Sequence, residues 1–437
     1  MDVLNVVITL AGLCFLLWVL WGRDRFRVRP DVRWYLTGYL LMALRVVFTW
    51  KRVCQINDLS VSYRPNMRSI GGGFVVRGES LRVSAPRIGW PMPTRDGIRL
   101  RVRLRPGQTP GPFLQAGEAF GHAWRAHSVR VTSPARGWLE ITATGGDPLG
   151  KGEPPAEGPG VLLRAEVGRM ETGKRWVIDF KLIPHWLIVG ATQSGKSTLM
   201  TRLVTELARQ PVALLGIDCK GGMELSLFAP RLSALATNRS QAVALLETIV
   251  TEMGDRMGVC RQHGARSLWE LPDSVRPVPL VVLVDEVAEL YLTTGAKSEK
   301  EEAAACATAM LRIAQLGRAL GVYLVVAGQR VGSDLGPGVT ALRAQLGGRI
   351  CHRVADPQTA VMTLGDLNPD AVAVAQAISP AEAGVAVTAT ETGGWVRARS
   401  WLTTAEDARG VAHQSAALVP WLPFLHLDDG RGGGEAA

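Results

Sequence analysis

The feature that most constrains this chain is a glycine-rich octet, Gly190-Ala191-Thr192-Gln193-Ser194-Gly195-Lys196-Ser197. It follows the apolar run Trp186–Val189 and leads into a helical pattern that begins with Ser197-Thr198. Such a loop between a strand and a helix directs backbone N–H groups and the positive end of the helix at phosphate oxygens. The lysine of the motif reaches the β- and γ-phosphates, and the hydroxyl residue ligates Mg²⁺. We therefore expect residues 190–198 to bind ATP, with Ser197 on the metal.

An acidic pair further along the chain adds the chemistry of hydrolysis. The apolar run Leu280–Val284 has the pattern of a buried strand and ends in Asp285-Glu286. Because α/β sheets bind ligands at the carboxyl ends of their strands, we expect both carboxylates beside the phosphate loop. Asp285 would hold the Mg²⁺ shell, and Glu286 would orient and deprotonate the attacking water. Together with Lys196, the pair predicts Mg²⁺-dependent ATP hydrolysis.

The part of the chain around these motifs alternates short β-rich runs with helical stretches, a pattern typical of an α/β parallel sheet. The long separation between Lys196 and Asp285 leaves room for intervening strands and helices, as in RecA-like motor folds. The fold class that we predict for residues 161–405 is therefore α/β, a RecA-like P-loop ATPase with a mainly parallel sheet. Strands are expected at 186–189, 212–217, 280–284 and 322–327, and long helices at 196–209, 239–260 and 300–320.

A smaller module precedes this motor. Residues 98–104 alternate apolar and charged side chains, which is the period of a half-exposed strand. A helix is expected at 114–127, and further strands are expected at 128–131 and 138–141. We interpret 53–144 as a small α+β domain that begins with a connecting region, 145–160 as a linker rich in Gly and Pro, and 406–437 as a C-terminal tail too short for another domain.

The N-terminal segment has the features of a membrane anchor. No charged residue occurs from Val3 to Gly22, a length that matches the hydrocarbon core of a bilayer. Asp2 precedes this run, and an arginine cluster, Arg23, Arg25, Arg27 and Arg29, follows it. A signal peptide has the opposite order of charge. We therefore predict an uncleaved, single-pass transmembrane anchor in the cell membrane, with the N-terminus outside and the ATPase in the cytoplasm.

A second apolar run, residues 34–50, is harder to interpret. It is shorter and carries Arg45 near its middle, which would cost on the order of 3 kcal/mol at a bilayer centre. Basic residues flank it, namely Arg33, Lys51 and Arg52. We interpret this run as an interfacial or protein-packed helix rather than a second span, and we assign residues 1–52 as a whole to the membrane anchor.

The composition leaves two interpretations of the charge open. The net charge is +10, and 41 of the 49 basic residues are arginines. This bias fits a GC-rich genome, and it also fits a polyanionic partner, because guanidinium groups bind phosphates bidentately. The six cysteines show no CxxC or ligand-like spacing, so a zinc site or a disulfide framework is not expected.

The motifs taken together resemble those of the FtsK/SpoIIIE DNA translocases. The likeness begins with the string from Pro184 to Ser197 and covers roughly residues 160–390. Further matches follow in the family's order: Ile217-Asp218-Cys219-Lys220-Gly221-Gly222, Glu252-Met253 with Arg256, Val284-Asp285-Glu286, and Leu316 to Leu324 leading into Ala327-Gly328-Gln329-Arg330. The resemblance implies a homohexameric ring that moves double-stranded DNA through its central pore.

The same resemblance suggests roles for several polar residues. It implies that Gln329 is the sensor that links the state of the γ-phosphate to movement. Arg318, Arg330 and Arg349 are candidates for an arginine finger that acts across a subunit boundary, with Arg318 ranked first. The alternative for each of them is a solvated or salt-bridged arginine. Basic groups at Arg343 and Arg349 would face the DNA backbone, whereas His185 is expected to be packed or capping rather than catalytic.

Departures from the usual family pattern indicate which branch of the family the chain resembles. Gln329-Arg330-Val331 stands where Gln-Arg-Pro is familiar, no winged-helix domain follows, and the apolar segments at the N-terminus are few. In these respects the chain resembles the short transfer proteins of actinobacterial plasmids and integrative elements, which move double-stranded DNA between cells in conjugation. The stretch from Trp34 to Tyr39 and the module around 98–143 share this likeness.

Three alternative functions remain open at this stage. One is a DNA translocase for chromosome segregation or partition. Another is a protein-secretion ATPase, although such motors usually string several ATPase modules in one chain. The third is a non-catalytic assembly protein, which the presence of Lys196, Ser197, Asp285 and Glu286 disfavours. The sequence does not specify ring size, polarity of movement or DNA sequence preference.

Overall fold

The structure is a computed structural model that describes residues 34–63, 82–94, 97–147, 149–150, 160–365, 369–390 and 394–425. The chain divides into two compact units, Met1–Pro148 and Leu149–Ala437. The predicted anchor Val3–Gly22 lies outside the described residues. Within the described ranges, no helix has both the length and the apolar character needed to cross a membrane.

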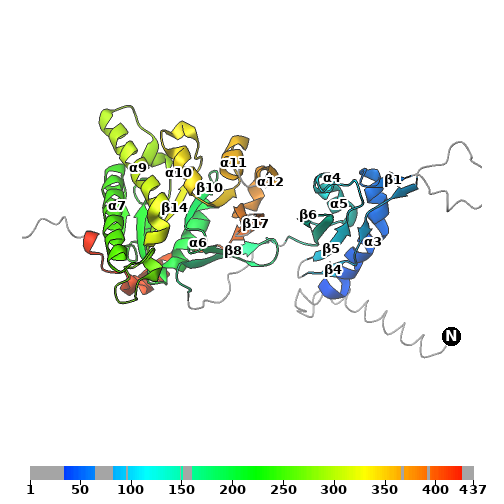
Figure 1. Ribbon diagram of the computed structural model, residues 1–437, viewed down its shortest axis with the longest axis horizontal. Helices are drawn as coiled ribbons and strands as arrows, with labels where there is room; N and C mark the ends of the chain where they lie inside the picture. Colours follow the sequence, from blue (N-terminus) through cyan, green and yellow to red (C-terminus); the bar gives the residue numbers. More distant parts are fainter. Residues whose placement is uncertain are drawn as a thin grey trace, which may run out of the picture. The chain divides into compact units, whose positions relative to one another are not determined.

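The first unit is built on an antiparallel sheet (Figure 1). Its strands are β3 (Arg87–Ile88), β4 (Met92–Pro93), β5 (Gly97–Arg103), β6 (Ser128–Ala135) and β7 (Trp138–Thr144), and a separate pair is formed by β1 (Val61–Tyr63) and β2 (Arg82–Ser84). In β5, the side chains of Ile98, Leu100 and Val102 are buried, whereas the arginines between them are exposed. This alternation confirms the strand that the sequence predicts at 98–104.

Helices cover the apolar face of this sheet. They are α3 (Tyr39–Ile56), which follows a π-helical turn at Trp34–Gly38, α4 (Gly111–Gln115) and α5 (Gly117–Trp124). Trp50 of α3 stacks on Phe120 of α5 at 5.7 Å between ring centroids, and Phe120 stacks on Trp124 at 5.0 Å. One face of α3 thus belongs to the core of this unit.

This packing agrees with a protein-packed helix in the second apolar run and argues against a second membrane span. Residues 34–50 are not a free membrane segment, because α3 is held in the first unit by Met42, Val46 and Trp50, all buried. The helix also continues to Ile56, into the region that the sequence assigned to a connection. The single helix expected at 114–127 is instead divided at Ala116 and ends at Arg125, whose φ of 54° is left-handed.

The second unit contains a ten-stranded sheet with the order β12-β11-β13-β14-β10-β15-β16-β17-β8-β9. The first six strands in this order are parallel: β12 (Ala234–Ala236), β11 (Ala213–Ile217), β13 (Leu280–Val284), β14 (Val322–Gly328), β10 (His185–Val189) and β15 (Gly348–His352). The remaining strands extend the sheet in antiparallel fashion: β16 (Val385–Ala389), β17 (Trp395–Ser400), β8 (Arg164–Met170) and β9 (Arg175–Asp179).

Helices pack on both faces of this sheet. The main ones are α6 (Lys196–Ala208), α7 (Arg239–Gln262), α9 (Lys297–Leu320), α10 (Val339–Gln345) and α13 (Ala405–Gln414), and the shorter ones are α8 (Ala288–Tyr291), α11 (Pro357–Leu364) and α12 (Pro369–Gln376). Short 3₁₀ turns occur at Leu225–Phe228, Leu268–Glu270, Ser333–Leu335, Pro380–Glu382, Ala416–Leu418 and Pro423–Leu425.

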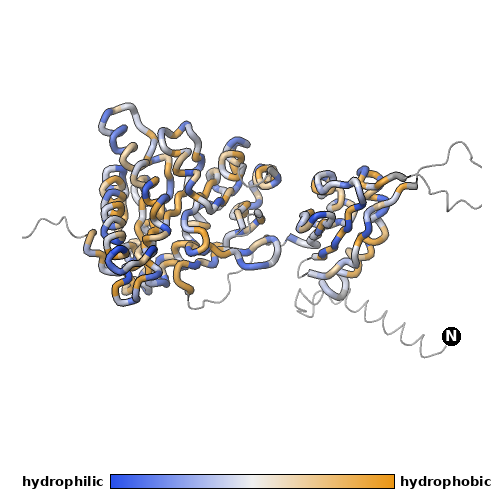
Figure 2. The backbone as a smooth tube through the Cα atoms, viewed as in Figure 1, coloured by the Kyte–Doolittle hydropathy of each residue, from blue (hydrophilic) through white to orange (hydrophobic). Residues whose placement is uncertain are grey.

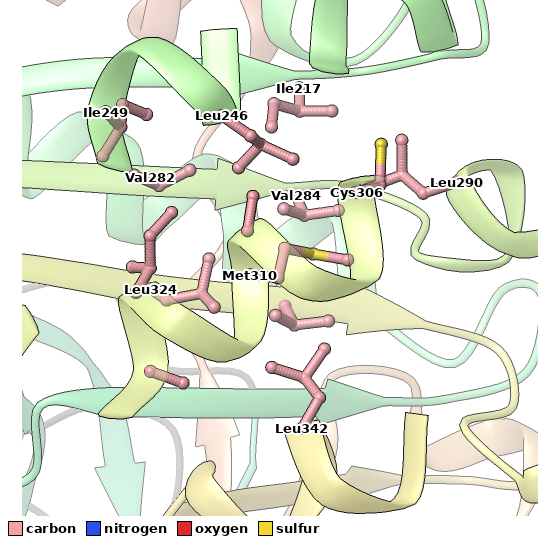
Figure 3. Packing of buried hydrophobic residues seen from close by; sticks show 14 of the residues in the cluster. Ile217, Leu246, Ile249, Val282, Val284, Leu290, Cys306, Met310, Leu324 and Leu342 are labelled. Carbon is pink, nitrogen blue, oxygen red and sulfur yellow. The ribbon is translucent and has the colours of Figure 1, made fainter. Parts of the chain in front are cut away.

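The central strands are buried on both sides, which is why they read as continuous apolar runs. Val282 and Val284 of β13 join the core under α7 and α9, together with Leu246 and Met310 (Figure 3). Neighbouring residues Val281 and Leu283 join the opposite core. Figure 2 shows hydrophobic residues concentrated on these inner strands.

The structure confirms the α/β class with a mainly parallel sheet. The predicted strands correspond to β10, β11, β13 and β14, and the predicted long helices to α6, α7 and α9. The C-terminal segment differs from the expected tail. Ala408, Val411 and Ala412 of α13 are buried in the core on one face of the sheet, and Leu422 is buried in the core under α7 and α9 on the other face.

Candidate functional site

Four neighbouring parallel strands bring the predicted motifs to one edge of the sheet. Register pairs the last residues of β10 and β14, Val189 and Gly328, and the last residues of β11 and β13, Ile217 and Val284. Between the two pairs the ends are offset by only two residues. The residues that follow these ends are Gly190, Asp218, Asp285 and Gln329. Motifs far apart in the sequence therefore meet where α/β sheets bind their ligands.

The phosphate loop has a conformation that requires glycine at its last position. Gly195 has φ of 106°, and a Cβ built on it would lie 2.5 Å from the backbone of Gly384. The Gly384 N–H donates to the Ser194 carbonyl at 2.9 Å. On another side, the Arg353 guanidinium donates to the Thr192 carbonyl at 2.9 Å. The segment before β16 and the end of β15 thus fix the loop in place.

Lys196, the first residue of α6, points at the acidic pair. Its Nζ donates to the backbone carbonyl of Asp285 and to Oε2 of Glu286, both at 3.1 Å. The Lys196 and Glu286 side chains are only 10% and 7% exposed. This ion pair is therefore poorly screened by water.

The Glu286 carboxylate has two further contacts. Nζ of Lys220, a residue in the loop after β11, lies 3.5 Å from Oε2. The backbone N–H of Gln329 donates to Oε1 at 3.2 Å. Contacts from three segments thus hold one carboxylate between Lys196 and the end of β14, and they couple its position to the segment that follows the predicted sensor strand.

Asp285 and Ser197 lie on the other side of Lys196. Asp285 is buried, and this burial raises the pKa of its carboxyl group, against the opposing effect of Lys196. In the described residues its Oδ1 has no hydrogen-bond partner. The Ser197 hydroxyl donates to Glu224 at 3.3 Å. No group of three or more His, Cys, Asp or Glu residues that could hold a metal by itself occurs in the described ranges.

The loop after β11 contains Lys220 and Glu224, and hydrogen bonds to Asp218 order it. The buried carboxylate of Asp218 accepts from the backbone N–H groups of Glu224 at 2.8 Å and Leu225 at 3.1 Å. Two consecutive glycines with positive φ, Gly221 and Gly222, allow the chain to turn between these points. Asp218 therefore fixes the conformation of this loop, in which Lys220 and Glu224 lie beside the phosphate loop.

These residues enclose a cavity of about 300 Å³, at the small end of the range for ligand pockets. Its lining comprises the phosphate loop and the polar groups around it: Gly190, Ala191, Thr192, Gln193, Gly195, Lys196, Ser197, Thr198, Lys220, Glu224, Asp285, Gln329 and Ala383. The sequence missed Lys220, Glu224 and Ala383 as site residues. Lys220 could have been found, because the segment Asp218 to Gly222 matches the family pattern. That match alone did not assign a function to the lysine.

None of the three predicted arginines lines this cavity. Arg318 is exposed in the last turn of α9, just before the start of β14, whereas the cavity lies beyond the end of that strand. Arg330 is half exposed and pairs with Asp334 at 3.5 Å. Arg349 is buried and donates to the Arg343 carbonyl, which indicates a structural role rather than a finger.

His185 is packed, as the sequence predicts. Its Nδ1 accepts from the backbone N–H of Leu324 at 3.1 Å, and burial lowers the pKa of this histidine to about 4. His352, below the phosphate loop, is also fully buried, and its pKa is lowered to about 4 for the same reason. Both rings are therefore neutral near pH 7.

Comparisons with known proteins place the chain in a family. Residues 161–276 and 270–333 match the FtsK/SpoIIIE family, and residues 20–145 match the actinomycete conjugal transfer protein N-terminal domain. The transfer protein TraSA of Streptomyces ambofaciens is 42% identical over 351 residues, 78% of this chain and 84% of TraSA. The chain belongs to the FtsK/SpoIIIE family. It is an ATPase of that family, in the branch of the conjugal transfer proteins.

A more distant relative and a solved structure extend this result. The DNA translocase FtsK of Chlorobaculum tepidum is 32% identical over 214 residues, 45% of this chain and 25% of that protein. The structure of the pCW3 conjugation coupling protein TcpA, in monomer form with ATPγS, matches with a TM-score of 0.56 at 18% identity. It covers 86% of this chain and 99% of the TcpA chain, and at this identity it supports the shared fold.

Proposed function

We propose that the chain is an ATP-driven motor that moves double-stranded DNA from cell to cell in conjugation. The observation that carries this proposal is a cavity lined by Lys196, Asp285 and Gln329 in a member of this family. Glu286 contacts both the Lys196 ammonium and the Gln329 N–H. Relatives named as a transfer protein and as a DNA translocase supply the class of substrate. The abundant arginines fit a polyanionic track, which is bound mainly through its phosphates.

The residues present fit a nucleotide-bound Mg²⁺ ion. Such an ion needs one or two protein oxygens, since phosphates and waters complete its octahedron. The Ser197 hydroxyl and the Asp285 carboxylate meet this need, and the buried Oδ1 of Asp285 has no protein partner in the described part of the chain. When bound, the ion would neutralise charge that develops on the phosphates.

The protein groups have separable roles in this proposal. A triphosphate in the cavity competes with Glu286 for the Lys196 ammonium, so nucleotide binding frees the carboxylate to act as general base on water. Lys220 remains beside Oε2 during this exchange and acts as a positioning residue. Because the Gln329 N–H donates to the same carboxylate, a movement of Glu286 changes a contact of the segment after β14.

Assembly and location complete the proposal. A homohexamer around DNA places each cavity next to a neighbouring subunit. Arg318 is exposed and lies far from its own cavity, as a residue that acts on the site of a neighbour must. The uncharged run Val3–Gly22 would anchor the motor in the cell membrane, with its ATPase in the cytoplasm.

The proposal is tested by ATP hydrolysis of the detergent-solubilised full chain with and without duplex DNA. We expect strong stimulation by duplex, weakening with salt as counterion release requires, and no hydrolysis by Lys196→Ala. Stimulation by a peptide and not by duplex would indicate a secretion ATPase instead. In cells, deletion should abolish DNA transfer and leave chromosome segregation intact, and the reverse phenotype would indicate a partition motor.

A further inference from the structure

Helix α3 carries a second apolar face that the first unit leaves uncovered. Met42, Val46 and Trp50 point into the core, while the opposite side of the same turns exposes Leu40, Leu41, Leu44, Val47 and Phe48. Phe48 is 79% exposed and Leu44 is 50% exposed. In Figure 2 this part of α3 is mostly orange. A helix that is apolar all round is normally covered on every side, so this face requires a partner.

The loop between β3 and β4 exposes a further aromatic side chain. Trp90 is 69% exposed, and its indole Nε1 donates to the Tyr39 hydroxyl at 3.1 Å. The Tyr39 hydroxyl in turn donates to the Pro91 carbonyl at 2.9 Å, which ties the loop to the start of α3. We call Leu40, Leu41, Leu44, Val47 and Phe48 the α3 face. An indole with an apolar body and a polar N–H is typical of a membrane–water boundary.

Basic residues predominate in and around the sequence of α3. From Trp34 to Asn57 the sequence contains no acidic residue. Lys51 and Arg52 are exposed and continue the apolar face at the C-terminal end of the helix. Residues 23–33 add five arginines against two aspartates. An apolar helix face beside basic side chains is complementary to a bilayer surface with anionic headgroups.

The chain also holds this helix near the proposed anchor. Residues 23–33 separate the uncharged run Val3–Gly22 from the start of the helical segment at Trp34. Even fully extended, such a segment reaches about 40 Å at most. The other side of α3 is occupied by the core of its own unit, so the helix can lie on a bilayer but not cross it.

We propose that α3 lies in the membrane–water interface, with the α3 face among the acyl chains and Lys51 and Arg52 at anionic phospholipid headgroups. This inference rests on the membrane anchoring in the proposed function and adds a second attachment point to it. The first unit then serves as a platform on the bilayer rather than as a spacer that hangs from one span.

The test uses the full chain reconstituted in vesicles of phosphatidylglycerol and phosphatidylethanolamine. An environment-sensitive NBD probe is attached to Phe48→Cys in a Cys14→Ser, Cys219→Ser background. The control is Arg101→Cys, an exposed residue of β5 on the side of the sheet away from α3. We expect blue-shifted emission at position 48 and quenching by bromine-labelled acyl chains several-fold stronger than at position 101. Lys51→Glu, Arg52→Glu should reduce this difference.

Two outcomes would overturn the inference. Equal quenching at both positions would show that the α3 face does not enter the bilayer. Protection of position 48 from aqueous iodide without quenching by the brominated lipid would show that a second copy of the chain covers it instead.

A second readout on the same vesicles separates this inference from the proposed function. It is the stimulation of ATP hydrolysis by duplex DNA. If brominated lipid quenches position 48 but duplex does not stimulate hydrolysis, the motor alone is contradicted. If duplex stimulates hydrolysis but brominated lipid does not quench position 48, the membrane surface alone is contradicted.

Discussion

At the scale of single residues, the site depends on how one carboxylate is shared. Lys196 and Lys220 approach the same oxygen of Glu286, at 3.1 and 3.5 Å. The first lysine is nearly buried, whereas Lys220 is 37% exposed. Loss of Lys196 removes a phosphate ligand. Loss of Lys220 leaves the phosphate loop unchanged but removes a contact that positions the Glu286 carboxylate. The two lysines should therefore be distinguishable by kinetics.

Lys220→Ala should lower kcat for ATP hydrolysis about tenfold or more, because general-base catalysis depends on the position of the carboxylate. KM for ATP should change much less, since the phosphate loop is intact. Lys220→Arg should recover most of the rate, as a cation at the same place. A rise in KM with kcat unchanged would mean that Lys220 is a simple binding residue.

The buried histidines predict an acid-sensitive second unit. The pKa values of His185 and His352 are lowered to about 4 in the folded chain, against about 6.5 in an unfolded one. Below pH 6.5 the unfolded state binds more protons, so stability is complete above that pH and is lost toward pH 4. Each histidine contributes on the order of 3 kcal/mol to this loss. In denaturant titrations, His352→Asn should flatten the dependence between pH 4 and 6.5, and an unchanged slope would contradict this account.

At the scale of elements, the site is a loop clamped between strand ends. The sequence predicted Lys196 from the glycine-rich loop that follows an apolar strand, and Asp285 and Glu286 from their place at the end of another. Gln329 was implied by the family resemblance. The sequence did not indicate Glu224 or Gly384 as site residues. The position of Glu224 depends on a loop that Asp218 holds, and Gly384 reaches the phosphate loop because it precedes the antiparallel strand β16. The sequence analysis also did not predict the strands of the antiparallel extension. The pairing that joins β17 to β8 connects residues that are distant in sequence.

Gly195→Ala should abolish ATP binding, because the added Cβ would meet the Gly384 backbone at 2.5 Å in a left-handed conformation. Gly264→Ala is the matched control. Gly264 also has a positive φ, of 64°, but nothing lies within 4 Å of its Cβ position. That variant should lose about 1 kcal/mol of stability and keep full ATPase activity. Binding of a fluorescent ATP analogue distinguishes the two, and equal affinities would refute the clamped loop.

At the scale of the whole molecule, two units have separate cores and separate tasks. The second contains the ATPase motifs, and the first has the exposed α3 face. The boundary between anchor and first unit was not predictable from the sequence, because the apolar run 34–50 has the composition of a membrane helix. Its inward face is recognised only when Trp50, Phe120 and Trp124 are seen in one cluster.

Two truncations test this boundary. Deletion of residues 1–33 should leave the first unit folded, because α3 and its partners stay intact. Deletion of residues 1–52 removes Met42, Val46 and Trp50 from the core, and the loss of one such aromatic side chain alone typically costs about 3–5 kcal/mol. The shorter protein should therefore be cleaved rapidly by protease within residues 53–147. Equal resistance of both proteins would show that α3 is not part of this core.

The central claim is that ATP hydrolysis drives this chain along double-stranded DNA. Displacement of a third strand from a triplex measures that movement directly. The full chain should release the third strand when ATP is added, at a rate that falls with Lys196→Ala and with Glu286→Gln. Hydrolysis of ATP on duplex DNA without any release of the third strand would contradict the account, because it would show an ATPase that binds DNA and does not move along it.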